Sequence, residues 1–218
     1  MTIRTKLYLA ILLTVLGPMV TIAVALNAMD RLGDRFDEVQ DRSSRRALAL
    51  DLKFGVTDVN GWQTAWGYDD GRSRPRFDNA VGGFRRDLRA AEEAFTDSRE
   101  RALLRELESE FADFMRLDAV AWRALQRGRD DVTQRILLGP EIANFESTAG
   151  TAERLARYQE QAEGATEAAF GDERDTARKQ LIAVALGAAI VIVLLLLTAS
   201  DLARLALEGE RSRREPRT

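Results

Sequence analysis

Two uncharged apolar segments constrain this chain more than any other feature of its sequence. The first covers residues 7–26 (LYLAILLTVLGPMVTIAVAL) and the second covers residues 181–200 (LIAVALGAAIVIVLLLLTAS). A helix of about 20 apolar residues spans the roughly 30 Å hydrocarbon core of a bilayer. We therefore interpret residues 7–29 and 181–200 as transmembrane helices. The alternatives are a buried helix of a soluble protein for either segment and a cleaved signal peptide for the first, because the letters ALNA resemble a cleavage site.

Basic residues beside these segments predict the orientation of the chain in the plasma membrane. Arg4 and Lys6 precede the first segment, and five arginines follow the second. Short cytoplasmic loops and ends carry an excess of Lys and Arg. We therefore expect residues 1–6 and 201–218 to lie in the cytoplasm and residues 30–180 to lie outside it.

The composition excludes several classes of function. The chain contains no Cys and no His, so it has no thiolate nucleophile, no Ser-His-Asp relay and no Cys/His zinc site. Charged residues make up 31% of the chain, but the net charge is only -3, which is not the basic excess that nucleic-acid binding requires. The paired acids Asp69 and Asp70 lie beside glycine in a turn signal, YDDGRSRP, where solvent surrounds them. We expect no catalytic residues, metal, cofactor or nucleic-acid partner.

Residues 30–180 show heptad spacing and no strand alternation. Apolar residues repeat at intervals of 3 and 4, the pattern of helices that pack in a bundle. The predicted core positions are Leu48, Leu52, Gly55, Val59, Trp62 and Trp66 in the first outer helix, Phe77, Val81, Phe84, Leu88, Ala91 and Phe95 in the second, and Leu104, Leu107, Phe111, Phe114, Asp118, Ala121 and Leu125 in the third.

Turn and cap signals separate these helices. The YDDGRSRP stretch ends the first helix, Asp97 and Glu100 read as a capping box, and Gly128 ends the third helix. The dipeptide Gly139-Pro140 predicts a kink in the last helix. The sequence therefore predicts an all-α protein with an extracytoplasmic up-down four-helix bundle, whose first and last helices continue into the two spans.

The lengths of the predicted helices indicate a dimer. The two middle helices are short enough to stop about 25 Å above the membrane, at 1.5 Å per residue. Below that height the first and last helices alone cannot enclose a seam that contains Leu32, Phe36 and Val39. A second copy would complete a local four-helix bundle, which predicts a parallel homodimer through the first and last outer helices. The alternative is a pair of helices stabilised by the lipid bilayer or by an unrelated partner.

Polar residues at core-type positions indicate a site at the outer tip. Asp118 takes a core position, and a buried carboxylate is costly unless it is paired. Indole rings and amide groups from the first helix would lie near it and could line a small-molecule pocket. The candidate ligand-binding residues there are Asn60, Trp62, Gln63, Trp66 and Asp118. The alternatives for Asp118 are solvent exposure and an ion pair with Arg72, Arg76 or Arg135.

A second candidate site lies where the predicted bundle thins to two helices. Ser43 and Arg46 take core-seam positions in the first outer helix, beside Ser44 and Arg45. Arginines at a dimer interface would suit a ligand carboxylate, because guanidinium and carboxylate groups form paired hydrogen bonds. The alternatives are solvent exposure and an ion pair from Arg46 to Glu160 or Glu163.

The layout resembles the sensor half of bacterial methyl-accepting chemotaxis receptors of the four-helix-bundle type. The matching features are the basic start and anchor MTIRTKLYLAILLTVLGP, the Cys-free helical outer domain and the second span, over about residues 1–200. The stretches VNGWQTAWGYDDG and ILLGPE look like those of actinobacterial members. The resemblance implies that an outer ligand shifts a membrane-crossing helix. In that family the shift passes through a HAMP linker to a cytoplasmic coiled coil that carries methylation sites and docks a kinase. Similar modules serve as inputs of sensor kinases and diguanylate cyclases.

The tail DLARLALEGERSRREPRT departs from that family. It lacks the proline-containing HAMP start and the long signalling coil. We expect an extracytoplasmic sensor module without its output domain, as a truncated receptor gene would produce. The alternatives are a partner that pairs with full-length receptors and a non-signalling membrane scaffold.

Overall fold

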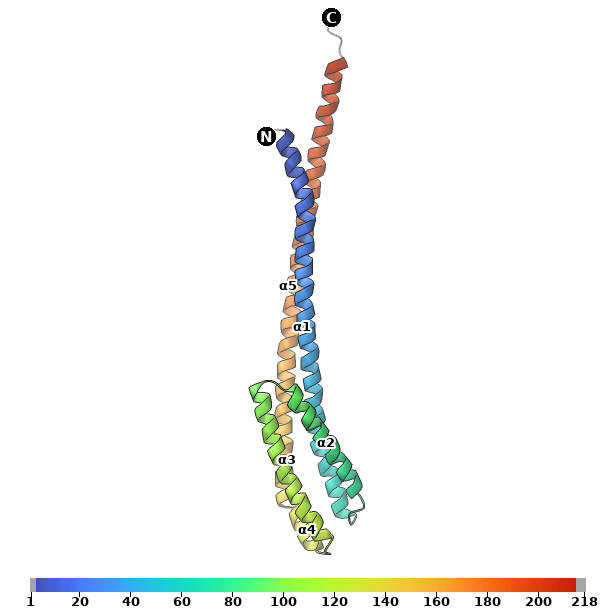
Figure 1. Ribbon diagram of the computed structural model, residues 1–218, viewed down its shortest axis with the longest axis vertical. Helices are drawn as coiled ribbons and strands as arrows, with labels where there is room; N and C mark the ends of the chain where they lie inside the picture. The colour runs from blue at the N-terminus through green and yellow to red at the C-terminus, as the bar shows by residue number, and fades with distance from the viewer. Residues whose placement is uncertain (1–2, 215–218) are drawn as a thin grey trace. The chain divides into compact units, whose positions relative to one another are not determined.

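The computed structural model describes residues 3–214, and these residues form five helices and no strand. The helices are α1 (Ile3–Tyr68), α2 (Arg74–Ala94), α3 (Ser98–Leu125), α4 (Asp130–Leu137) and α5 (Pro140–Arg214), as labelled in Figure 1. The prediction of an all-α protein is confirmed. The chain divides into two compact units, of which unit 1 contains Met1–Phe36 and Ala169–Thr218, and unit 2 contains Asp37–Ala168.

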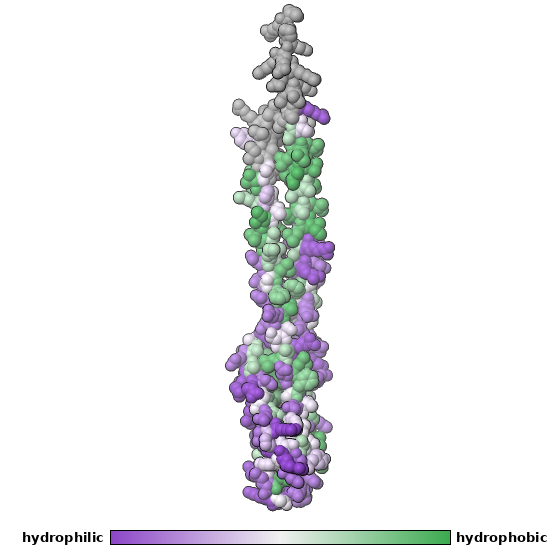
Figure 2. Space-filling view, turned by 90° about the vertical axis from the view of Figure 1, so that its right-hand side faces the viewer, coloured by the Kyte–Doolittle hydropathy of each residue, from purple (hydrophilic) through white to green (hydrophobic). Residues whose placement is uncertain are grey.

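Unit 1 consists of the parts of α1 and α5 that carry the apolar segments. Both helices contain stretches long and apolar enough to cross a membrane, which confirms that part of the prediction. The described side chains there are largely exposed, with 58% of Ile22 and 61% of Leu186 accessible. Figure 2 shows the resulting apolar surface over these helices, whereas hydrophilic residues are more frequent on the visible face of unit 2. Only 6% of the apolar window in α1 and none of that in α5 is buried, so the chain itself does not cover these segments.

Two small residues and one polar group join the helices of unit 1. Ala28 on α1 and Ala177 on α5 are both buried. Small side chains of this kind let two helix backbones approach closely. Beside them, Arg31 forms an ion pair with Glu173 at 3.4 Å and donates a hydrogen bond to Gln180 at 3.2 Å.

Unit 2 has one apolar core, to which α1, α2, α3 and α5 all contribute. The predicted core positions of α2 and α3 are buried, apart from a partly buried Leu125, and Phe95 directly after α2 is buried as well. Aromatic rings fill the centre, where the ring centroids of Phe84 and Phe111 lie 4.5 Å apart and those of Phe111 and Phe114 lie 6.2 Å apart. Gly55 allows α2 to approach α1, because a Cβ atom there would lie 2.8 Å from Phe84.

The predicted core face of α1 is partly wrong. The structure buries Ala49, Val56 and Gln63 where the heptad pattern placed Leu48, Gly55 and Trp62. The buried face is rotated by about one residue at these three positions, so the indole of Trp62 lies at the edge of the core instead. A pattern of apolar residues favours tryptophan over glutamine at a core position. Here glutamine is buried because polar side chains on other helices bind its amide.

The turns follow the predicted signals, with one correction. Asp70 and Gly71 adopt positive φ angles of 55° and 85° after α1, and Gly128 adopts 67° after α3. Asp97 and Glu100 form the predicted capping box at the start of α3. The prediction of a kink at Gly139-Pro140 is wrong, since α4 ends at Leu137 and α5 begins at Pro140. Proline lacks an N–H and suits the first position of a helix, so the chain starts a new helix there.

Candidate functional site

A buried polar cluster joins four helices of unit 2. The cluster consists of Gln63 on α1, Arg74 on α2, Asp118 on α3 and Glu141 on α5. Three of these side chains are almost fully buried, with 2% of Gln63 and 1% each of Asp118 and Glu141 exposed. The amide nitrogen of Gln63 donates to a carboxyl oxygen of Glu141 and, at 3.4 Å, to Oδ1 of Asp118. One amide group therefore bridges two acidic side chains from different helices.

Arg74 supplies the positive charge of this cluster. Its Nη1 atom lies 3.0 Å from Oδ1 of Asp118, and its Nη2 atom lies 2.9 Å from Oδ2. The guanidinium carbon lies 4.4 Å from the ring centroid of Phe77 and 4.9 Å from that of Trp122. Aromatic faces attract a cation and so help to hold this arginine in the interior. The alternative of an intrachain ion pair for Asp118 is confirmed, but the partner is Arg74 rather than any of the three predicted arginines.

The environment of the cluster changes the proton affinity of its acids. Burial raises the pKa of Glu141 to about 8, the negative charge of Asp118 adds to this rise, and the charge of Arg74 opposes it. Burial also raises the pKa of Asp118, although the hydrogen bond and charge of Arg74 and the hydrogen bond from Gln63 oppose the rise. Glu141 is therefore mostly protonated at neutral pH. The ion pair between Arg74 and Asp118 then carries the charges of the cluster.

A pocket of about 430 Å³ lies next to this cluster, between α1, α4 and α5. Gln63 and Asn60 line it from α1, while Leu137 on α4 and Phe145 on α5 provide apolar walls. Gly67 lets α4 approach α1, because a Cβ atom there would lie 2.5 Å from Cδ1 of Leu137. Gln63 both lines the pocket and binds the buried acids, so it connects the pocket to the cluster.

The structure brings together only some of the residues predicted for the tip site. Asn60 and Gln63 line the pocket, and Asp118 lies behind Gln63 as its hydrogen-bond partner. Trp66 lies in the core, where its ring meets that of Trp122 edge to face at 5.2 Å. Trp62 does not line this pocket and instead lies under the guanidinium of Arg76 at 4.8 Å.

Sequence reasoning missed Arg74, Glu141 and most of the apolar lining of the pocket. The lining residues that it missed include Leu137, Leu138, Ile142 and Phe145. The Gly139-Pro140 signal could have pointed to this region, since a helix that begins at Pro140 places Glu141 in its first turn.

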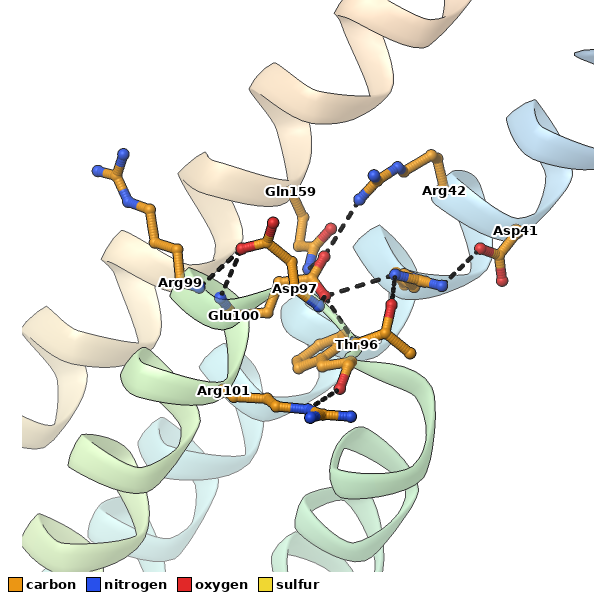
Figure 3. Close-up of polar contacts among 10 residues, drawn as sticks. Asp41, Arg42, Thr96, Asp97, Arg99, Glu100, Arg101 and Gln159 are labelled. Carbon is orange, nitrogen blue, oxygen red and sulfur yellow. Dashed lines mark hydrogen bonds and ion pairs between the residues drawn. The ribbon is translucent and has the colours of Figure 1, made fainter.

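A second buried cluster surrounds Glu100 and is shown in Figure 3. The Glu100 side chain is fully buried, and its Oε1 atom accepts from Arg42 at 3.2 Å and from Gln159 at 3.0 Å. Its Oε2 atom accepts from Arg45 at 3.4 Å and from the backbone N–H groups of Thr96 and Asp97, each at 3.0 Å. This one carboxylate therefore ties α1, α5 and the α2–α3 connection together.

The two arginines of the second predicted site are both engaged within the chain. Arg45 binds Glu100 and also forms an ion pair with Asp41 at 2.8 Å. Arg46 forms an ion pair with Glu163 at 2.8 Å, and Glu160 lies 3.8 Å from it. The predicted alternative of an ion pair from Arg46 to the last helix is confirmed. A role for Arg45 and Arg46 in binding a ligand carboxylate stays a prediction.

Comparison with protein-family models, with curated proteins and with solved structures found no match for this chain. Within residues that the structure describes, no group of three or more acidic side chains is placed to hold a metal ion. The functional interpretation therefore rests on the pocket, the two buried clusters and the apolar segments.

Replacing Glu141 with Gln should change how stability depends on pH. The raised pKa means that folded Glu141 binds a proton that the unfolded chain releases between pH about 4.5 and about 8. Its contribution to stability is therefore present at low pH and is lost as the pH rises through this window. Glu141→Gln stays neutral and keeps an acceptor for Gln63. We expect the free energy of unfolding of Glu141→Gln to exceed that of the wild type by roughly 2–4 kcal/mol at pH 8.5 and to match it near pH 4.5.

Denaturant unfolding of both proteins across this pH range checks the expectation. Glu93→Gln is the matched control, since Glu93 is exposed on α2, and its stability should follow that of the wild type at every pH. A constant difference between Glu141→Gln and the wild type from pH 4.5 to pH 8.5 would contradict a buried, titrating Glu141.

Replacing Glu100 with Ala should strongly destabilise unit 2. The change removes the acceptor of Arg42, Arg45 and Gln159 together and leaves these groups without their partner. Breaking a buried charge pair from one side costs about 3–5 kcal/mol. Glu93→Ala should change the free energy of unfolding by about 0.5 kcal/mol or less. Similar values for the two variants in denaturant unfolding would show that the Glu100 cluster does not stabilise the fold.

Proposed function

We propose that this chain is a membrane-anchored sensor module of the chemoreceptor type, in which unit 2 is an extracytoplasmic four-helix bundle. The observation that carries the proposal is that α1 and α5, the two helices with the apolar segments, also line the pocket of unit 2. A ligand in that pocket contacts both helices that are long enough to cross the membrane. Its binding can therefore change how α1 and α5 are placed against each other.

The exposed apolar side chains of unit 1 support a membrane anchor. Large side chains such as Leu186 and Ile190 are each 61% exposed, and each exposed Å² of apolar surface costs about 25 cal/mol in water. Hydrocarbon removes this cost, and a helix satisfies its own backbone hydrogen bonds there. The basic residues before the first apolar segment and after the second support a plasma-membrane protein whose two flanking segments lie in the cytoplasm.

The buried cluster around Glu100 supports a mechanism that moves one helix against another. Arg42 and Arg45 on α1 and Gln159 on α5 bind the same carboxylate of Glu100. A shift of α1 along α5 lengthens some of these hydrogen bonds unless the side chains find a second arrangement. Ligand binding would then favour one of two arrangements by its difference in affinity for them. Such a shift is the small displacement that the chemoreceptor resemblance implies.

Single-cysteine labelling tests the membrane arrangement. The chain has no cysteine, so each introduced thiol is the only one present. In intact cells, a membrane-impermeant maleimide should label Glu93→Cys in unit 2, whereas Arg204→Cys after the second apolar segment should react only once the membrane is permeabilised. Equal labelling of both variants in intact cells, or the reverse pattern, would refute the proposed orientation. The cysteine-free wild type controls for background labelling.

An uncovered face of α1 supports the parallel homodimer that belongs to this proposal. A shallow groove of about 460 Å³ follows Phe54, Gly61, Trp62 and Ala65, and 65% of Phe54 is exposed. Small residues between apolar ones let two helices meet closely, as in packed helix pairs. In a two-fold dimer the same face of each copy meets its equivalent.

Crosslinking checks the dimer. Gly61 has open space around it, so Gly61→Cys fits without displacing a neighbour. Near a two-fold axis this cysteine lies opposite its own copy, so mild oxidation should produce covalent dimers. Glu93→Cys on α2 lies on another element and should remain monomeric under the same conditions. Equal dimer yields for both variants, rising with protein concentration, would indicate random collision and refute this interface.

A further inference from the structure

The pocket between α1, α4 and α5 has a chemical character that indicates the class of its ligand. This inference rests on the proposed sensor function and deepens it. Four of the lining side chains are large and apolar, and Leu138 and Ile142 among them are 61% and 42% exposed. The volume of about 430 Å³ lies in the range of pockets for small organic ligands. The ligand therefore has an apolar body that covers these side chains.

Two polar side chains of the pocket, Gln63 and Thr64, have spent their hydrogen-bond donors, whereas Asn60, Tyr68 and Gln134 also line the pocket with groups that can donate or accept. The amide nitrogen of Gln63 donates to Glu141 and Asp118 inside the fold, which leaves the carbonyl oxygen of this amide as the remaining polar group. The hydroxyl of Thr64 donates its hydrogen to the backbone oxygen of Asn60 at 2.9 Å, so it too can only accept a further bond. A ligand that donates hydrogen bonds fits the acceptors of Gln63 and Thr64.

The single charged side chain of the lining is acidic. Glu146 lies in the second turn of α5 and is exposed. No ion-pair partner for its carboxylate is found in the part of the chain that the structure describes. An unpaired carboxylate at the edge of an apolar pocket attracts a cation.

We propose that this pocket binds a primary ammonium compound with an apolar or aromatic body, with its ammonium group at Glu146 and its body against Leu137, Leu138 and Ile142. The ammonium group has three donors and no acceptor, which complements the acceptors left on Gln63 and Thr64. A carboxylate ligand would face Glu146 as a like charge. The occupied pocket joins α1, α4 and α5, and so couples ligand binding to the helices of the proposed sensor.

Three phenyl compounds of similar size and different charge test this inference on the full chain in detergent micelles. They are 2-phenylethylamine, 2-phenylethanol and 3-phenylpropionate, and the readouts are the thermal unfolding temperature and calorimetric binding. The amine should raise the unfolding temperature most, because ligand binding to the folded state stabilises it. The alcohol should bind more weakly, and the carboxylate should bind least. Added salt should weaken the binding of the amine but not that of the alcohol, since salt screens the charge interaction at an exposed carboxylate.

Variants separate the charge of the pocket from its shape. Glu146→Gln should weaken binding of the amine by about threefold to tenfold and leave the alcohol unchanged. Glu93→Gln removes an exposed acid on α2 and should leave the affinities for all three probes unchanged. Gly67→Ala places a Cβ atom against Leu137 at the pocket wall, so it should lower the affinity for the amine and for the alcohol by the same factor.

The outcomes distinguish this inference from the sensor proposal. If the wild type and Glu93→Gln prefer the amine and Glu146→Gln does not, the result supports both the ligand class and the sensor proposal. If the carboxylate or the alcohol binds at least as well as the amine in a manner sensitive to Gly67→Ala, the ligand class is wrong and the sensor proposal stands. If none of the probes binds, or if Glu146→Gln leaves amine binding intact, the inference is overturned, whereas the labelling experiment decides separately on the membrane anchor.

Discussion

The ion pair between Arg74 and Asp118 allows the core of unit 2 to contain a polar centre. A lone carboxylate in an apolar core costs several kcal/mol, and a partner with paired hydrogen bonds offsets much of that cost. Two nitrogen atoms of Arg74 lie 3.0 Å and 2.9 Å from the carboxylate oxygens of Asp118. The face of the nearby Phe77 ring attracts the positive charge of Arg74. Gln63 can then remain buried beside these groups, because Asp118 and Glu141 both accept from its amide. The pocket borders on Gln63 and so depends on the same ion pair.

The apolar residues of the middle helices were predictable from the sequence because their packing is local in origin. In α2 and α3, side chains at intervals of 3 and 4 residues lie on one face of a helix, and one face is all that the core requires. The spacing alone thus predicts Phe84 and Phe111 as core residues. The capping box of Asp97 and Glu100 was also readable, since its members lie three residues apart. Its second role, in which Glu100 binds Arg42 and Gln159, depends on residues 58 and 59 positions away.

The polar part of the candidate site was not predictable in the same way. Whether a polar residue is buried depends on partners from other helices, and heptad spacing says nothing about them. At the core face of α1 the sequence favoured Trp62, yet Gln63 takes that place because two acids from distant segments bind its amide. The partner of Asp118 was sought among three arginines, whereas Arg74 forms the pair from the first position of α2. The break before Pro140 mattered most, because it directs Glu141 into the cluster and shapes the pocket wall.

Both buried polar clusters of unit 2 include side chains of the helix α1. Gln63 on α1 binds the acids beside the pocket, Arg42 and Arg45 bind Glu100, and Arg46 binds Glu163 on α5. These bonds extend over several turns of one helix, so α1 cannot slide continuously without breaking them in turn. Close-packed interfaces with specific hydrogen bonds have discrete arrangements and resist intermediate ones. Under the proposed sensor function, a ligand that contacts α1 and α5 at the pocket would act on a helix whose position is held by polar contacts at several levels. A small change there would then shift the helix rather than be absorbed locally.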